Sequence, residues 1–116
     1  DIDASLAFYR DTLGFTPAGD GPMPGGAHMW RLMCGTSMIK LLRFSPAPTE
    51  KPAKGGINGG LGYRYWTMSV SNIAEITDAV AAAGYKVRIP VTEIRAKTSI
   101  SMVEDPDGNT VELLGP

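Results

Sequence analysis

Two stretches of the chain follow the same plan, and this internal repeat limits the possible folds more than any other feature. "DIDASLAFYRDTLGF" (1–15) and "NIAEITDAVAAAGY" (72–85) each start with a polar residue that can cap a helix. Apolar residues then recur at helical spacing, and each stretch ends with Gly followed by an aromatic residue. In the second stretch, Asn72 is expected to cap the helix with Glu75 three residues on. The sequence therefore predicts one supersecondary unit used twice.

Short apolar runs that are typical of strands follow each predicted helix. A further run, 63–70, precedes the second helix, but nothing comparable precedes the first. We therefore expect a leading strand of the first unit to lie upstream of Asp1. The runs after the helices are 28–35 and 37–44 in the first unit, and 85–91, 98–104 and 110–114 in the second.

This order of elements predicts an α+β fold made of two tandem βαβββ units, with the first strand missing. The chain has 116 residues, which suits a single domain spanning 1–116. Within it we expect unit one at 1–44, a linker at 45–62 and unit two at 63–116. The linker is rich in Pro, Gly and Lys, and its "GGINGG" lacks the Lys-Ser/Thr of a phosphate-binding loop.

Composition excludes several classes of function. The formal net charge is −1, and Lys and Arg are scattered, so we expect no nucleic acid partner. No apolar run approaches the length of a membrane span, so we expect no membrane partner. Cys34 is the only cysteine, which rules out an internal disulfide and is typical of a reducing compartment. We therefore expect a cytoplasmic location.

The end of the chain carries the most informative motif, "EDPDGNTVELL" (104–114). Its first half has Pro ahead of Gly and Asn, which predicts a tight turn. Its second half predicts a strand with Val111 and Leu113 on one face and Glu112 on the other. A carboxylate on this strand either meets water or belongs to a functional site.

The repeated units, the opening helix and the terminal motif together resemble the vicinal oxygen chelate superfamily, which includes glyoxalase I, extradiol dioxygenases and bleomycin resistance proteins. The resemblance implies a cupped mixed sheet with helices on the outside. It also implies that a small organic ligand lies inside the cup and that two chains form a homodimer. It does not specify the reaction, because this fold supports many chemistries.

Metal enzymes of this superfamily take ligands from four strand positions. The resemblance puts Glu112 on the fourth position, while the first lies upstream of Asp1. Lys40 occupies the second, where a carboxylate is needed, and Tyr65 the third, where an imidazole is needed. A protonated lysine is not a metal donor, and a unit charge about 4 Å from a dication costs roughly 8 kcal/mol at an effective dielectric near 20.

The preferred hypothesis is therefore a site without a metal, in a protein that binds or converts a small organic ligand. Lys40 would supply a cationic donor and Glu112 an acceptor or general base, and these are the two candidate catalytic residues. Strand alternation puts Tyr65 and Thr67 on a polar face suited to ligand binding. It places Met38 and Leu42 beside Lys40 as apolar ligand contacts.

Two alternatives stay open. One is a metal-dependent lyase, epimerase or dioxygenase that holds one divalent ion (Fe, Mn, Ni or Zn), with Glu112 as one ligand and the others supplied by the missing strand or by a dimer partner. The other is a protein that has lost ligand binding and acts through its dimer surface. Whether the protein is an enzyme is not decided by the sequence.

Overall fold

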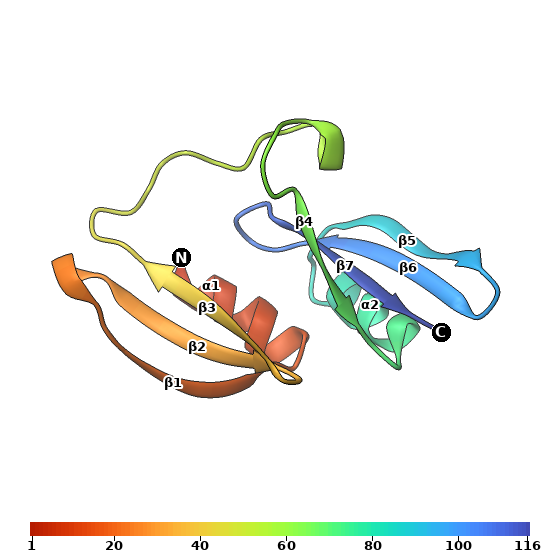
Figure 1. Ribbon diagram of the computed structural model, residues 1–116, viewed down its shortest axis with the longest axis horizontal. Helices are drawn as coiled ribbons and strands as arrows, with labels where there is room; N and C mark the ends of the chain where they lie inside the picture. Colours follow the sequence, from red (N-terminus) through yellow and green to blue (C-terminus); the bar gives the residue numbers. More distant parts are fainter. The chain divides into compact units, whose positions relative to one another are not determined.

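The computed structural model describes residues 1–116 and divides into two compact units, Asp1–Glu50 and Lys51–Pro116. Each unit contains helical turns packed on one β-sheet (Figure 1). This arrangement confirms the α+β class and the repeated helix-and-sheet plan. No helix has the length and apolar character needed to cross a membrane.

Unit one opens with helix α1 (Ile2–Leu6), and Asp1 is its cap. The Asp1 side chain accepts a hydrogen bond from the Ala4 amide at 3.1 Å, which satisfies one of the free donors of the first turn. The chain continues through wider π-helical turns at Ala7–Thr12, and Gly14 then takes a φ of 80° that ends them. The buried apolar residues of this segment are Leu6, Phe8, Tyr9, Leu13 and Phe15.

The sheet of unit one has the strand order β1-β2-β3 and is antiparallel throughout. Its strands are β1 (Thr16–Pro22), β2 (His28–Cys34) and β3 (Ser37–Arg43). β2 and β3 match the predicted runs, but β1 was not predicted. Its sequence, TPAGDGP, has no apolar alternation, so only its pairing with β2 makes it a strand.

The sheet of unit two has the strand order β4-β7-β6-β5. β4 (Tyr65–Ser69) pairs parallel with β7 (Thr110–Gly115), whereas β6 (Thr98–Glu104) pairs antiparallel with β7 and with β5 (Val87–Arg95). β5 runs four residues beyond the end predicted at 91, because antiparallel pairing continues as far as Arg95 opposite Thr98.

Helix α2 (Ile73–Ala82) packs against this sheet through its buried face (Figure 1). Thr77 Oγ1 lies 2.8 Å from Ser101 Oγ on β6, so the two buried hydroxyls satisfy each other. The N-terminal cap of α2 differs from the capping expected from the sequence. Asn72 makes no side-chain hydrogen bond to the helix backbone, and its Nδ2 instead donates to Glu75 Oε2 at 3.3 Å.

The predicted turn between β6 and β7 is organised by one buried carboxylate, that of Asp105. Its Oδ1 accepts hydrogen bonds from the amides of Asp107 at 3.0 Å and Asn109 at 2.8 Å, and its Oδ2 accepts one from Asn109 Nδ2 at 3.0 Å. Gly108 has a φ of 91°, a conformation that favours glycine. The side chain of Asp105 therefore sets the geometry with which the last strand begins.

We expect Asp105→Ala to lower the free energy of unfolding by about 2 kcal/mol, because it leaves the turn amides without their charged acceptor. The matched control is Asp107→Ala, which removes an exposed carboxylate and keeps the backbone amide that Asp105 binds. Urea denaturation followed by circular dichroism measures both. Equal effects of the two substitutions would contradict the role given to Asp105.

Candidate functional site

The candidate carboxylate, Glu112, lies on β7 directly beside Thr67 of β4. The parallel register pairs Thr67 with Glu112, and Thr67 Oγ1 donates a hydrogen bond of 2.8 Å to Glu112 Oε1. On its other side, Glu112 is opposite Met102 of β6, which is buried. The carboxylate is thus held between a hydroxyl donor and an apolar side chain, and it is only half-buried.

The predicted alternation of β4 is confirmed by burial. Tyr65 and Thr67 are exposed, whereas Met68 is buried and Trp66 is half-buried on the opposite face. Val111 and Leu113 are fully buried, as predicted for the other face of β7. One face of the unit two sheet therefore forms the core, and the other presents Tyr65, Thr67 and Glu112.

Lys40 belongs to unit one, on β3, and is exposed. Met38 and Leu42 lie on the same face of that strand, also exposed, as the alternation predicts. The structure therefore joins Thr67 to Glu112 by a hydrogen bond. It describes Lys40 in a different unit from Glu112, and their expected pairing stays a prediction.

The residues around Glu112 do not suit a divalent metal ion. Such an ion in this superfamily is expected to need imidazole or carboxylate donors in addition to one glutamate. The neighbours of Glu112 across both adjacent strands are a threonine hydroxyl and a methionine thioether. No three His, Cys, Asp or Glu side chains in the chain gather in a way that could hold a metal ion. Glu112 therefore has no second carboxylate and no imidazole among its cross-strand neighbours.

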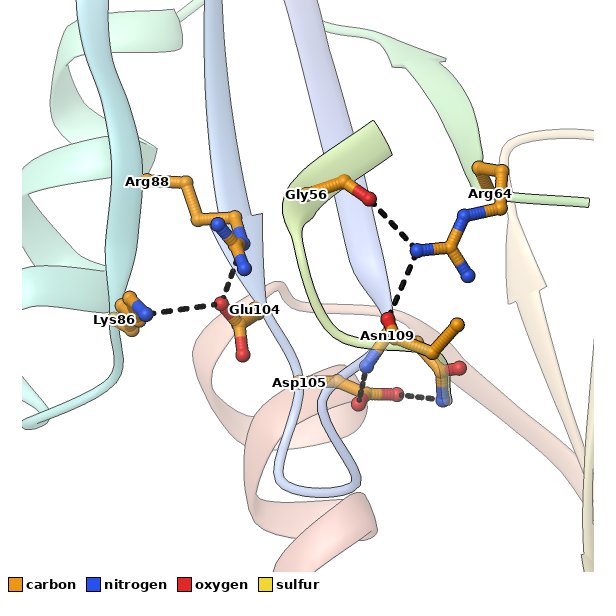
Figure 2. A network of polar contacts seen from close by, with 8 residues as sticks. Gly56, Arg64, Lys86, Arg88, Glu104, Asp105 and Asn109 are labelled. Carbon is orange, nitrogen blue, oxygen red and sulfur yellow. Dashed lines mark hydrogen bonds and ion pairs between the residues drawn. The ribbon is translucent and has the colours of Figure 1, made fainter. Parts of the chain in front are cut away.

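A polar network that the sequence does not predict lies near the start of β7, within unit two (Figure 2). Glu104 Oε2 is 2.6 Å from Arg88 Nε and 3.6 Å from Lys86 Nζ, so the carboxylate lies between two cations. Arg64 Nη2 donates to the carbonyl oxygens of Ala53 at 2.9 Å and Gly56 at 2.7 Å. These bonds join Arg64, the residue directly before β4, to two earlier carbonyl groups of the same connecting segment.

Arg64 and Arg88 line a cavity of about 30 Å³ with Asn109. This volume is at most about a tenth of the roughly 300–1,000 Å³ of typical organic-ligand pockets, so the cavity is too small for an organic ligand. No spacing in the sequence connects these residues, because the segment before β4, β5 and the turn after β6 meet only through folding. The ion pairs of this network connect the beginning of β5 to the end of β6, and the Arg64 bonds hold the segment before β4, so we regard its role as structural.

Comparison with known proteins identifies the family. Residues 1–113 match the model of the Glyoxalase/Bleomycin resistance protein/Dioxygenase superfamily, and the chain belongs to this superfamily. Among curated proteins, no sequence matches the chain significantly.

Solved structures of this superfamily share the fold at low sequence identity. A glyoxalase family protein from Enterococcus faecalis is 22% identical with a TM-score of 0.73, covering 98% of this chain and 88% of its own. A glyoxalase family protein from Bacillus cereus is 19% identical with a TM-score of 0.84, covering 98% and 85%. Glyoxalase I from Zea mays is 18% identical with a TM-score of 0.75, covering 100% of this chain but 41% of its own. These likenesses show the fold.

Cys34, at the end of β2, is a free thiol whose environment disfavours its reactive form. Partial burial raises the pKa of the Cys34 thiol, so at a given pH less thiolate is present than in an exposed cysteine. We expect the pH profile of alkylation by iodoacetamide to inflect at higher pH in the folded protein than in the same protein unfolded in urea. An inflection at the same or lower pH would contradict this account.

Proposed function

We propose that this protein binds a small organic ligand, to sequester it or to act on it by acid–base chemistry, without a resident metal. The ligand-binding residues are Tyr65, Thr67 and Glu112 of unit two, and Met38, Lys40 and Leu42 of unit one. Membership of a superfamily whose members bind small ligands supports this proposal, and so do the accessible polar groups of Tyr65, Thr67 and Glu112 on one face of the unit two sheet.

The observation that carries the proposal is the hydrogen bond between Thr67 and Glu112 on that face. Thr67 donates to Oε1 and so orients the carboxylate, while Oε2 makes no hydrogen bond within the protein. Glu112 Oε2 is then available to accept a hydrogen bond or a proton from a ligand. Lys40, which makes no ion pair, supplies a cationic donor, and Tyr65 supplies a phenolic hydroxyl.

The alternative is a metal-dependent lyase, epimerase or dioxygenase. It rests on the position of Glu112, which the family resemblance places at a ligand position, and it requires further donors from residues upstream of Asp1 or from the partner in a homodimer. A cytoplasmic homodimer is part of both proposals.

We expect Glu112→Gln to weaken binding of a ligand found by thermal-shift screening about tenfold, because an amide oxygen accepts hydrogen bonds less strongly than a carboxylate. Lys40→Ala should weaken binding similarly. Glu93→Gln is the matched control, because Glu93 is an exposed glutamate on β5, and it should leave the affinity unchanged. Calorimetric titration measures all four proteins, and unchanged affinity in both Glu112→Gln and Lys40→Ala would refute these roles.

We expect the protein to contain no stoichiometric metal, because Glu112 has no second carboxylate or imidazole beside it in the sheet. Elemental mass spectrometry before and after incubation with Fe(II), Mn, Ni and Zn is the measurement. Near-stoichiometric uptake that Glu112→Gln abolishes would favour the metal-dependent alternative.

A further inference from the structure

Unit one places two cations side by side on its sheet. Arg31 of β2 and Lys40 of β3 are direct partners in the antiparallel register, so their side chains leave the same face of the sheet. Like charges at directly opposite positions repel each other. An arrangement of this kind is stabilised when an anion binds between the two head groups.

The cations stand between apolar neighbours on the same face. The register pairs on either side of Arg31 and Lys40 bring four long apolar side chains onto that face, and three of them are thioethers with flexible, polarizable chains. We call this the cationic face of unit one. Its members are Met29, Arg31 and Met33 of β2, with Met38, Lys40 and Leu42 of β3.

No carboxylate of unit one neutralises the two cations, and neither Arg31 nor Lys40 forms an ion pair. The neighbouring strand β1 bulges between Pro17 and Asp20, which is the level of Arg31. Asp20 is opposite Trp30 in the register and therefore points to the other face, where its Oδ2 lies 2.6 Å from His28 Nε2. Asp20, the only carboxylate of β1, therefore contacts His28 on the opposite face of the sheet and does not neutralise Arg31 or Lys40.

The helical segment supplies no counter-charge either. The Asp1 side chain caps α1, the exposed Asp3 forms no ion pair, and Asp11 is held by Arg10 in an ion pair of 2.7 Å. The opposite face of the sheet carries Leu32, which is buried to 1% exposure and belongs to the core of the unit. Positive charge is therefore concentrated on the face that does not form the core.

We propose that the cationic face binds an amphipathic organic acid. The guanidinium of Arg31 and the ammonium of Lys40 bind its anionic group, a carboxylate or phosphate ester, and the methionines contact its apolar body. The planar fork of an arginine matches the paired oxygens of both groups, and lysine adds a point charge. This inference rests on the proposed ligand-binding function, and it adds Arg31 and the chemical class of the ligand.

The test compares two fluorescent probes of similar shape, anilinonaphthalene sulfonate, which is an anion, and N-phenylnaphthylamine, which is neutral. We expect the wild-type protein to bind the anion at least about tenfold more tightly than the neutral probe. Arg31→Gln with Lys40→Gln should remove this preference, and Arg31→Lys with Lys40→Arg should keep it. Arg43→Gln is the matched control, because Arg43 lies on β3 but on the opposite face, over the Trp30 ring.

Displacement of the bound anionic probe then identifies the anionic group. Octanoate or octyl phosphate should displace the probe at lower concentration than octanol does. Whichever of the two displaces it at the lower concentration carries the preferred anionic group. Equal displacement by octanol would overturn the inference. Circular dichroism of each variant establishes that it is folded before binding is measured.

Different results would contradict the anion-binding inference and the proposed ligand-binding function. Binding of both probes with equal affinity, or a preference that survives Arg31→Gln with Lys40→Gln, overturns the inference and leaves the proposed ligand-binding function standing. Binding of neither probe counts against both proposals. A change in oligomeric state in that double variant, with probe binding unaltered, would mean that the cationic face contacts a second copy of the chain, and this too overturns the inference.

Discussion

The parallel pairing of β4 with β7 is the constraint on which the candidate site depends. It joins the first and last strands of unit two and places Thr67 beside Glu112, although 45 residues separate them in the chain. A shift of one residue in this register would turn Glu112 toward the core face and Val111 toward solvent. The Asp105 turn stabilises the register from the other side, because it determines where β7 begins after β6.

The same supersecondary plan carries different chemistry in the two units. The open face of the unit two sheet presents a carboxylate with hydroxyl groups, whereas the corresponding face of the unit one sheet presents two cations among methionines. A repeated fold thus repeats the backbone and the core, while the residues facing away from the core are free to differ. This freedom explains how one scaffold supports many functions, and why function has to be argued from the residues of each face.

Periodicity and capping predicted most of the fold. Helix α2 and strands β2, β3, β4, β6 and β7 lie where the apolar pattern places them, and all of these except β3 contribute buried residues to a core. β1 was not predicted because its residues have low strand propensity. It forms a strand only because it pairs with β2. For the site, alternation correctly put Tyr65 and Thr67 on one face and Met38, Lys40 and Leu42 on another.

By itself, the sequence determined the α+β class, the repeat, and which residues of β3, β4 and β7 share a face, because these follow from local spacing along the chain. Only the tertiary structure decided which residue of one strand stands opposite which residue of the next. That choice made Thr67 the partner of Glu112, Arg31 the neighbour of Lys40, and Glu104 the acceptor between Lys86 and Arg88. Register depends on long-range pairing and turn geometry, which a single strand's pattern does not contain.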